Sequence, residues 1–188
     1  MLLVGCASPT PGDVAYRGGH YVQAANLYRH GAELGDSTAA LKIGLMLSEK
    51  QIDTKEYGQA TQWFTKACDL GNEAGCHNAG NAYEYGQFGS NKDYDKARKY
   101  YMLSAEKGFI QSQYNLGSIY SNQYFNNDIE GLKWILIAKK SADTCSNAPL
   151  CQWVKKDPPA HQNKLTSRMT KEQIESAQKQ ANIWTPKQ

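Results

Sequence analysis

Residues 97–120 read ARKYYMLSAEKGFIQSQYNLGSIY, and two earlier stretches of the chain repeat the spacing of their small and aromatic residues. The spacing is 36 and then 37 residues, counted from Tyr21 to Tyr57 and from Tyr57 to Tyr94. The other recurring positions are Ala24, Ala60 and Ala97; Tyr28, Phe64 and Tyr101; Gly35, Gly71 and Gly108; Gly44, Gly80 and Gly117; and Leu47, Tyr83 and Tyr120. A period in this range is typical of a solenoid built from helix pairs.

Each unit is expected to hold two helices. Ala60, Phe64 and Ala67 fall on one helical face, and Gly71 follows Leu70 where a glycine ends a helix. The recurring glycine at 44, 80 and 117 falls inside the second helix, where glycine costs about 1 kcal/mol relative to alanine. Because this cost recurs at one offset, we expect a neighbouring helix to approach closely over each glycine.

The chain continues beyond the three regular units. A fourth, less regular unit begins near Asp128 and places Gly131, Trp134, Ile135 and Ala142 at the repeat offsets. Residues 157–159 (Asp-Pro-Pro) are expected to break helical structure. Residues 170–173 fit a capping box, and the apolar residues after it share one helical face: Ile174, Ala177, Ala181 and Trp184. This pattern predicts a final helix that covers the last repeat.

The repeat resembles the Sel1-like family, a relative of tetratricopeptide repeats. The family motif is matched by residues 97–101, Ala105, Gly108, residues 113–117 and Tyr120, and again by residues 60–64, Gly71, residues 78–80 and Tyr83. The resemblance covers about residues 21–142. It implies an all-α fold, a right-handed solenoid of antiparallel helix pairs with a C-terminal capping helix. We divide the chain into residues 1–12 (lipobox remnant and tether), 13–154 (Sel1-like repeat solenoid) and 155–188 (linker and capping helix).

Four of the five cysteines form two close pairs, Cys68 with Cys76 and Cys145 with Cys151. Neither pair has the C-x2-C spacing that is common in zinc sites. Two local pairs favour two disulfides and an oxidising compartment, with zinc binding and free buried thiols as alternatives. The spacing of the first pair also resembles that of cysteine-rich Sel1-like proteins, in which such pairs link consecutive helices.

Leu3-Val4-Gly5-Cys6 resembles the bacterial lipobox. A complete export signal needs a charged segment and a longer apolar segment, so the alternatives are an internal start and a chance match. The resemblance implies a lipidated Cys6, followed by a tether from Ser8 to Gly12. Because Ala7 follows Cys6, it implies a periplasmic protein anchored to the outer membrane. No run of 18 or more apolar residues is present, so we expect membrane contact only through the lipid.

Charge and motifs exclude several function classes. The net charge of +3 is spread among acids, whereas nucleic-acid binding requires basic residues gathered on one face. The sequence contains no H-E-x-x-H, G-x-S-x-G or phosphate-binding glycine motif. We therefore expect a protein that is not an enzyme and that holds neither a cofactor nor a metal ion.

A protein partner is the remaining expectation. In tetratricopeptide-like solenoids one helix of each pair lines the concave side, and the resemblance assigns that role to the helices with the recurring mid-helix glycine. The groove-facing positions are then Leu41, Leu45 and Ser48; His77, Asn81 and Glu84; and Tyr114, Ser118 and Ser121. Their mixture of aromatic, polar and acidic groups is typical of a partner-binding surface.

The lipobox and the repeat together resemble immunity proteins that accompany type VI secretion effectors. This resemblance implies a protein that neutralises a secreted phospholipase effector by steric blockade. The alternatives are an assembly scaffold tethered to the outer membrane and a β-lactam-binding protein of the cysteine-rich Sel1-like group.

Overall fold

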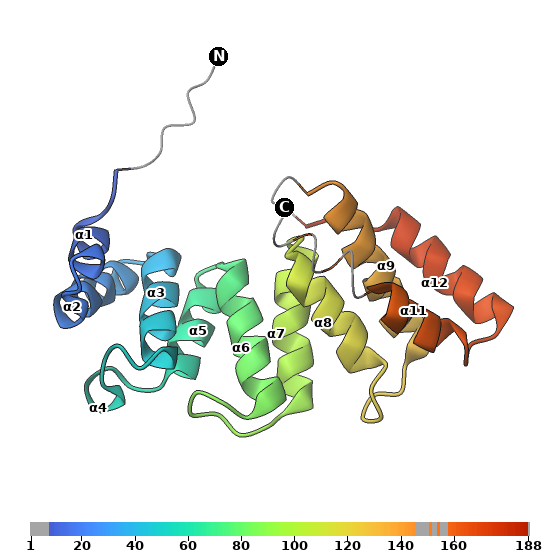
Figure 1. Cartoon of the computed structure of the whole chain (residues 1–188), viewed down its shortest axis with the longest axis horizontal. Helices are drawn as coiled ribbons and strands as arrows, with labels where there is room; N and C mark the ends of the chain where they lie inside the picture. The colour runs from blue at the N-terminus through green and yellow to red at the C-terminus, as the bar shows by residue number, and fades with distance from the viewer. Residues whose placement is uncertain (1–7, 146–150, 152–153, 155–157, 188) are drawn as a thin grey trace, which may run out of the picture.

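The computed structural model describes residues 8–187 except 146–150, 152–153 and 155–157. Every regular element in these residues is a helix, which confirms the all-α prediction. The helices are α1 (Pro11–Arg17), α2 (Tyr21–Glu33), α3 (Ser37–Ser48), α4 (Thr54–Tyr57), α5 (Ala60–Asp69), α6 (Glu73–Tyr85), α7 (Tyr94–Glu106), α8 (Ile110–Tyr120), α9 (Asp128–Asp143), α11 (Pro158–Thr166) and α12 (Lys171–Ile183). They are stacked along the longest axis, from α1 and α2 at one end to α12 at the other (Figure 1).

The turns between paired helices are built around the recurring glycine. Gly35, Gly71 and Gly108 have φ angles of 95°, 90° and 90°, a left-handed conformation that glycine adopts without steric cost. At the first turn the Asp36 N–H donates to the carbonyl of Gly31 at 2.9 Å. Glycine therefore ends the helix as predicted, and the next helix starts two residues later.

The mid-helix glycines confirm the predicted close approach. A Cβ built on each of them would lie between 2.5 and 2.8 Å from a large side chain of the following long helix. The three pairs are Gly44 with Phe64, Gly80 with Tyr101, and Gly117 with Ile135. Packing of a ring or branched chain directly on the glycine backbone offsets the helix-propensity cost.

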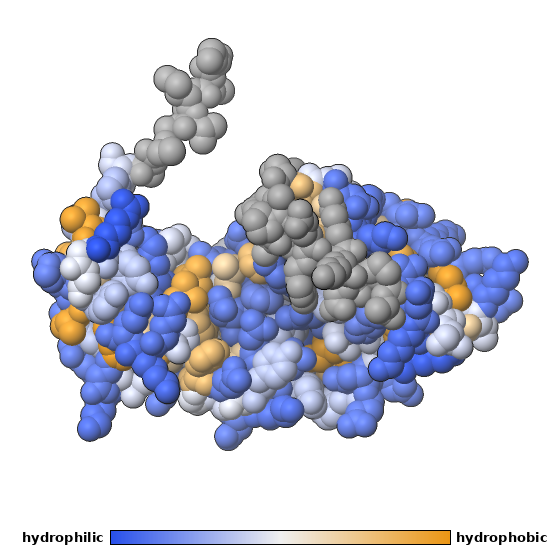
Figure 2. All heavy atoms as spheres, in the orientation of Figure 1, coloured by the Kyte–Doolittle hydropathy of each residue, from blue (hydrophilic) through white to orange (hydrophobic). Residues whose placement is uncertain are grey.

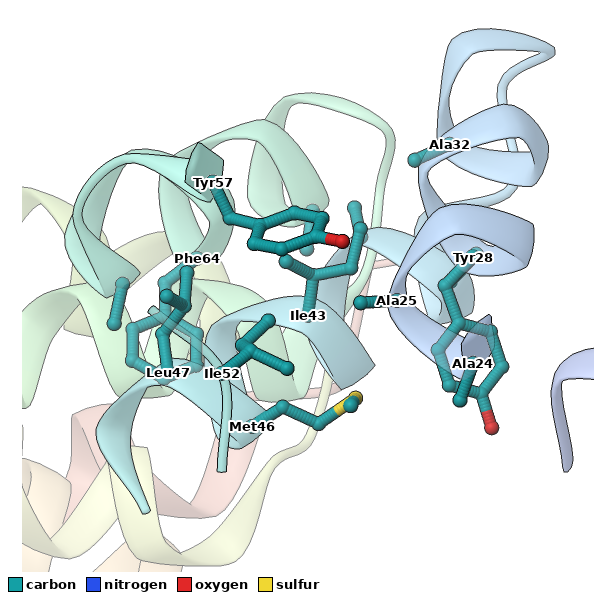
Figure 3. Close-up of a cluster of buried hydrophobic side chains, with 14 of the residues drawn as sticks. Ala24, Ala25, Tyr28, Ala32, Ile43, Met46, Leu47, Ile52, Tyr57 and Phe64 are labelled. Carbon is teal, nitrogen blue, oxygen red and sulfur yellow. The ribbon is translucent and has the colours of Figure 1, made fainter. Parts of the chain in front are cut away.

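The interior is a row of side-chain clusters rather than one central core. In the first cluster, Ile43 of α3 lies between Ala25 of α2 and Phe64 of α5 (Figure 3). Two further clusters follow, one around Tyr101 and one around Ile135. Most helix contacts join neighbours in the sequence, as expected for a helical repeat solenoid.

α1 starts inside the segment that the sequence analysis assigned to a tether. Pro11 occupies its first helical position, where the missing N–H of proline costs nothing. Thr10 Oγ1 accepts from the Asp13 N–H at 3.2 Å, and the Asp13 carboxylate accepts from the Thr10 N–H at 3.1 Å. A Cβ on Gly12 would lie 2.6 Å from the Tyr28 ring. α1 and α2 thus repeat the glycine–aromatic pairing, and Pro11 and Gly12 belong to the solenoid.

The C-terminal residues fold back onto the last repeat. α12 begins at the predicted capping box of Thr170 and packs against α9, with Ala177 and Ala181 buried. Trp184 is half-buried, and its ring centroid lies 5.8 Å from that of Trp134. The capping helix is therefore confirmed.

α11 differs from the prediction. Residues 157–159 were expected to break helical structure, whereas Pro158 is the first residue of α11. Proline interrupts a helix interior but is tolerated in the first turn, where its N–H would have no partner. The segment assigned to a linker therefore contains a helix, and that helix packs against α9.

Both cysteine pairs are joined by disulfides. Cys68 of α5 is bonded to Cys76 of α6 across the turn between them, with Cα atoms 4.5 Å apart. Cys145, two residues after α9, is bonded to Cys151, which is buried. Cys6, the predicted lipidation site, lies outside the residues that the structure describes. Within those residues, no helix has the length and apolar character needed to cross a bilayer.

Candidate binding face

The nine predicted contact residues lie on three helices, and we call this surface the α3–α6–α8 face. Its α3 part is the most apolar. Leu45 is 37% exposed, and Leu41 and Ser48 are partly exposed. Figure 2 shows a hydrophobic strip between α3 and α6 with polar surface on both sides. Such an apolar centre with a polar surround is typical of protein-binding surfaces.

In the α6 part, a network of hydrogen bonds surrounds His77, and we call this network, which includes Ser104, Ser112 and Asn81, the α6 floor. Ser104 Oγ donates to the Glu73 carbonyl oxygen at 2.8 Å, and Ser112 Oγ donates to Ser104 Oγ at 2.8 Å. Ser112 has then used its only hydrogen, so it accepts from His77 Nδ1 at 2.9 Å. His77 Nε2 is left to accept from the Asn81 amide at 3.1 Å. Burial lowers the pKa of His77 to about 4, so the ring is neutral at pH 7 and both nitrogens are occupied.

Glu84 continues the same floor through Tyr101. The Tyr101 hydroxyl lies 2.7 Å from Asn81 Oδ1 and 2.5 Å from Glu84 Oε2. A phenol has one hydrogen and cannot donate it fully to two oxygens. Burial raises the pKa of the Glu84 carboxyl. The Tyr101 hydroxyl therefore shares its hydrogen between Asn81 Oδ1 and Glu84 Oε2, and it links the two side chains of α6.

The α8 part is covered by α11 and the residues after it. The Tyr114 hydroxyl lies 3.4 Å from His161 Nδ1, and Ser121 Oγ lies 3.3 Å from His161 Nε2. Arg168 donates to the Ser121 carbonyl at 2.9 Å and pairs with Asp128. Tyr114 is only 8% exposed. The expectation for Tyr114 is therefore corrected from a surface contact to a packing residue, because α11 lies where solvent was expected.

A pocket of about 220 Å³ opens between α1 and α3, at the other end of the face. It is lined by Tyr16, Tyr28, Leu45 and Met46 and by the charged residues Asp13, Arg17, Lys42 and Glu49. Lys42 pairs with Asp13, and the Tyr28 hydroxyl donates to Asp13 at 2.8 Å. The hydrogen bond from Lys42 has the largest effect on the Asp13 carboxyl, and the one from Tyr28 has the next largest. Together they hold the pKa of this carboxyl well below its usual range.

Sequence reasoning missed the α1 side of this pocket. It found Leu45 by repeat spacing, but it assigned the residues before Asp13 to a tether and drew no site from Tyr16 or Arg17. The available signal was Thr10, Pro11 and Asp13, which together form a capping box with proline at the first helical position.

The Sel1 repeat family matches three consecutive stretches of the chain, residues 37–72, 74–109 and 110–143. Together these stretches make up more than half of the sequence. The chain belongs to the Sel1 repeat family. Sel1 repeat proteins generally mediate protein–protein interactions, and the repeat is a non-catalytic scaffold.

Two solved structures share the fold of this Sel1 protein. One is a protective antigen present in uropathogenic Escherichia coli strains that displays an SLR fold, with a TM-score of 0.68, 24% identity, and coverage of 90% of this chain and 37% of that protein. The other is a Sel1 repeat protein from Oxalobacter formigenes, with a TM-score of 0.53, 23% identity, and coverage of 87% and 67%. The chain thus spans little more than a third of the first protein. No curated protein matches the sequence.

The Sel1 repeat starts one helix later than the unit identified from spacing. Residues 37–72 hold α3 and α5, residues 74–109 hold α6 and α7, and residues 110–143 hold α8 and α9. In this frame each mid-helix glycine contacts a large side chain of its own repeat. α1 and α2, which precede the matched residues, show the same contact between Gly12 and Tyr28.

The described residues contain no group of three or more His, Cys, Asp or Glu side chains placed to hold a metal ion. His77 is held by its neighbours, as shown above, and four cysteines are disulfide-bonded. What the Sel1 repeats arrange is a surface: an apolar pocket at α3, a fixed polar floor at α6 and a covered end at α8.

Proposed function

We propose that this Sel1 protein is a periplasmic immunity protein that binds a type VI secretion effector with phospholipase activity. Binding would block the active site of the effector or its access to the membrane. The observation that carries the proposal is the α3–α6–α8 face, which has an exposed apolar end and a polar floor whose hydrogen bonds are already made.

Steric blockade requires an area rather than a reacting group. A protein interface of ordinary size buries about 800 Å² on each partner, and the uncovered part of the face extends over α3 and α6. Because His77, Asn81 and Glu84 are held by hydrogen bonds within the protein, binding need not order them. A surface fixed in this way loses less side-chain entropy on association.

The periplasmic location is supported by the two disulfides, which form and persist in oxidising compartments. We propose that Cys6 carries the lipid and that the protein is held at the outer membrane. Mass spectrometry of the membrane fraction should find a lipidated N-terminal Cys6, and Cys6→Ala should move the protein to the soluble periplasmic fraction. A membrane-bound Cys6→Ala variant would contradict the lipid anchor.

Co-expression tests the immunity proposal. Any lipase-like toxin encoded next to the gene for this chain is produced together with the chain, and growth and complex stoichiometry are measured. We expect protection of the cells and a tight one-to-one complex. If no such toxin gene lies adjacent and deletion does not sensitise cells to their sisters, the immunity proposal is wrong. Several weaker partners with envelope defects would indicate an assembly scaffold, and acylation of the purified chain would indicate β-lactam binding.

A further inference from the structure

The covered and uncovered ends of the face use equivalent repeat positions. At the covered end, Ser118 of α8 and Ser121 and Asn122 just after it line a cavity of about 180 Å³ together with residues of α11 and its end. Two repeats earlier in the sequence, the same positions are Leu45, Ser48 and Glu49. Leu45 and Glu49 line the pocket between α1 and α3. The two cavities therefore share equivalent repeat positions, which lie next to α11 in one cavity and next to α1 in the other.

The helix that covers the α8 position shows what this feature can accept. α11 directs Leu165 inward, where it is 1% exposed and packs in the cluster that contains Tyr114. The remaining residues of α11 and its end that line the cavity are basic or can be protonated: His161, Lys164 and Arg168. The occupant is thus a helix with one buried leucine and flanking basic side chains.

The α3 position offers matching chemistry for a similar helix. Tyr16, Leu45 and Met46 form an apolar wall. Glu49 stands where α8 has Asn122, is exposed, and its carboxylate has no ion-pair partner among the residues that the structure describes. Lys42, the lysine of the pocket lining, is already paired with Asp13, and Arg17 is the other basic residue of the lining. An incoming basic residue can therefore pair with Glu49 at the edge of the apolar wall.

We propose that the α1–α3 pocket docks a helix of the partner protein in the manner of α11. The partner helix packs a leucine- or phenylalanine-sized side chain against Leu45 and Met46 and places a lysine or arginine at Glu49. This inference rests on the proposed function in requiring a protein partner, and it assigns the anchor site and the chemistry of the segment that enters it.

A phage-displayed library of helical peptides, selected on the full chain, tests the docking. We expect enriched peptides with a large apolar residue and a lysine or arginine three or four positions away, which share a helical face. Leu45→Glu should weaken their binding by about tenfold or more, as expected for the loss of an interface anchor. Leu103→Glu on α7, at 41% exposure against 37% for Leu45, is the matched control and should leave binding unchanged.

Charge reversal gives a second measurement that does not depend on the apolar wall. Glu49→Lys should weaken the same peptides by about threefold to fivefold, whereas Glu33→Lys, an exposed acid on α2, should have no effect. Circular dichroism verifies that all four variants keep the fold. Peptides that bind wild type and Leu45→Glu equally, or that share no apolar–basic pattern, would overturn the proposal.

Self-association is the competing occupant. If light scattering shows a dimer of the full chain that Leu45→Glu dissociates, the pocket serves a second copy and the proposal is wrong. The peptide measurements involve no toxin. Failure of the co-expression test alone would therefore remove the immunity function and leave the docking site intact, and the reverse also holds.

Discussion

The α8 end and the α3 end of the binding face present equivalent repeat positions in opposite states. At the α8 end, α11 lies over Tyr114 and Ser121. At the α3 end, Leu45 and Glu49 border a pocket that the described part of the chain leaves open. The comparison shows that the repeat creates the positions, whereas segments outside the matched repeats decide which of them a partner can reach.

The largest expected difference between the two ends is in how much stability is lost when a leucine is replaced by alanine. Leu165→Ala should lower the free energy of unfolding by about 2 to 5 kcal/mol, because a buried leucine leaves a cavity. Leu45→Ala, at the open end, should cost less than about 1 kcal/mol because its side chain is already partly in water. Urea unfolding at pH 7 measures both, and equal losses would contradict the assignment of a covered and an open end.

Lowering the pH tests how much the burial of neutral His77 on α6 contributes to the dependence of stability on pH. The pKa of His77 is about 4, below the ordinary value near 6.5, so the unfolded chain binds the proton first as pH falls. Stability should therefore drop by roughly 3 kcal/mol between pH 6.5 and pH 4 on account of this group. His77→Gln should remove this part of the loss, and His30→Gln, which changes an exposed histidine, should keep it. An unchanged acid profile for His77→Gln would show that the floor is not coupled to folding.

The glycine contacts should also differ between the ends. A Cβ on Gly117 would meet Ile135 at 2.8 Å and the Gly131 carbonyl at 2.9 Å, between two long helices. Gly117→Ala should cost about 1 to 3 kcal/mol through overpacking. Gly12→Ala meets only the Tyr28 ring, and because α1 is a seven-residue terminal helix that can shift, its cost should be smaller. Thermal unfolding of the two variants checks the order, and the reverse order would contradict it.

The smallest effect is expected at the ion pair that fastens the end of α11. Arg168→Gln removes the ion pair with Asp128. The side chain of Arg168 is 43% exposed and that of Asp128 is 20% exposed. The loss should stay below about 1 kcal/mol and should shrink at high salt. Lys171→Gln breaks a more exposed pair with Glu175 and serves as the control, with no measurable change. A loss at Arg168 that salt does not affect would point to packing rather than charge.

Local signals predicted the regular part of the fold. The turn glycines, the mid-helix glycines and the capping box at Thr170 all act on residues within one repeat or one turn, and the structure contains each of them. The two errors have a common cause. Residues 8–12 were assigned to a tether and residues 157–159 to a break, whereas Pro11 and Pro158 each start a helix, because proline fits the first helical position as well as it fits a loop.

The candidate site was predictable only in part. Repeat spacing located Leu45, His77 and Asn81 on one face, but it could not show that Tyr114 is covered or that Tyr16 lines a pocket. Nor could it show that Glu84 shares a hydrogen bond with Tyr101, since the partners lie on different helices.

The sequence by itself determined the helices of the regular repeats, their turns and the fit of each mid-helix glycine against a large side chain, because these depend on residues close together in the chain. Only the tertiary structure decided which end of the face is available. His161 reaches Tyr114 from 47 positions away and Ser121 from 40, and contacts at that separation follow from how the chain folds back. The same repeat positions can therefore form a packed interior at one end and a binding pocket at the other.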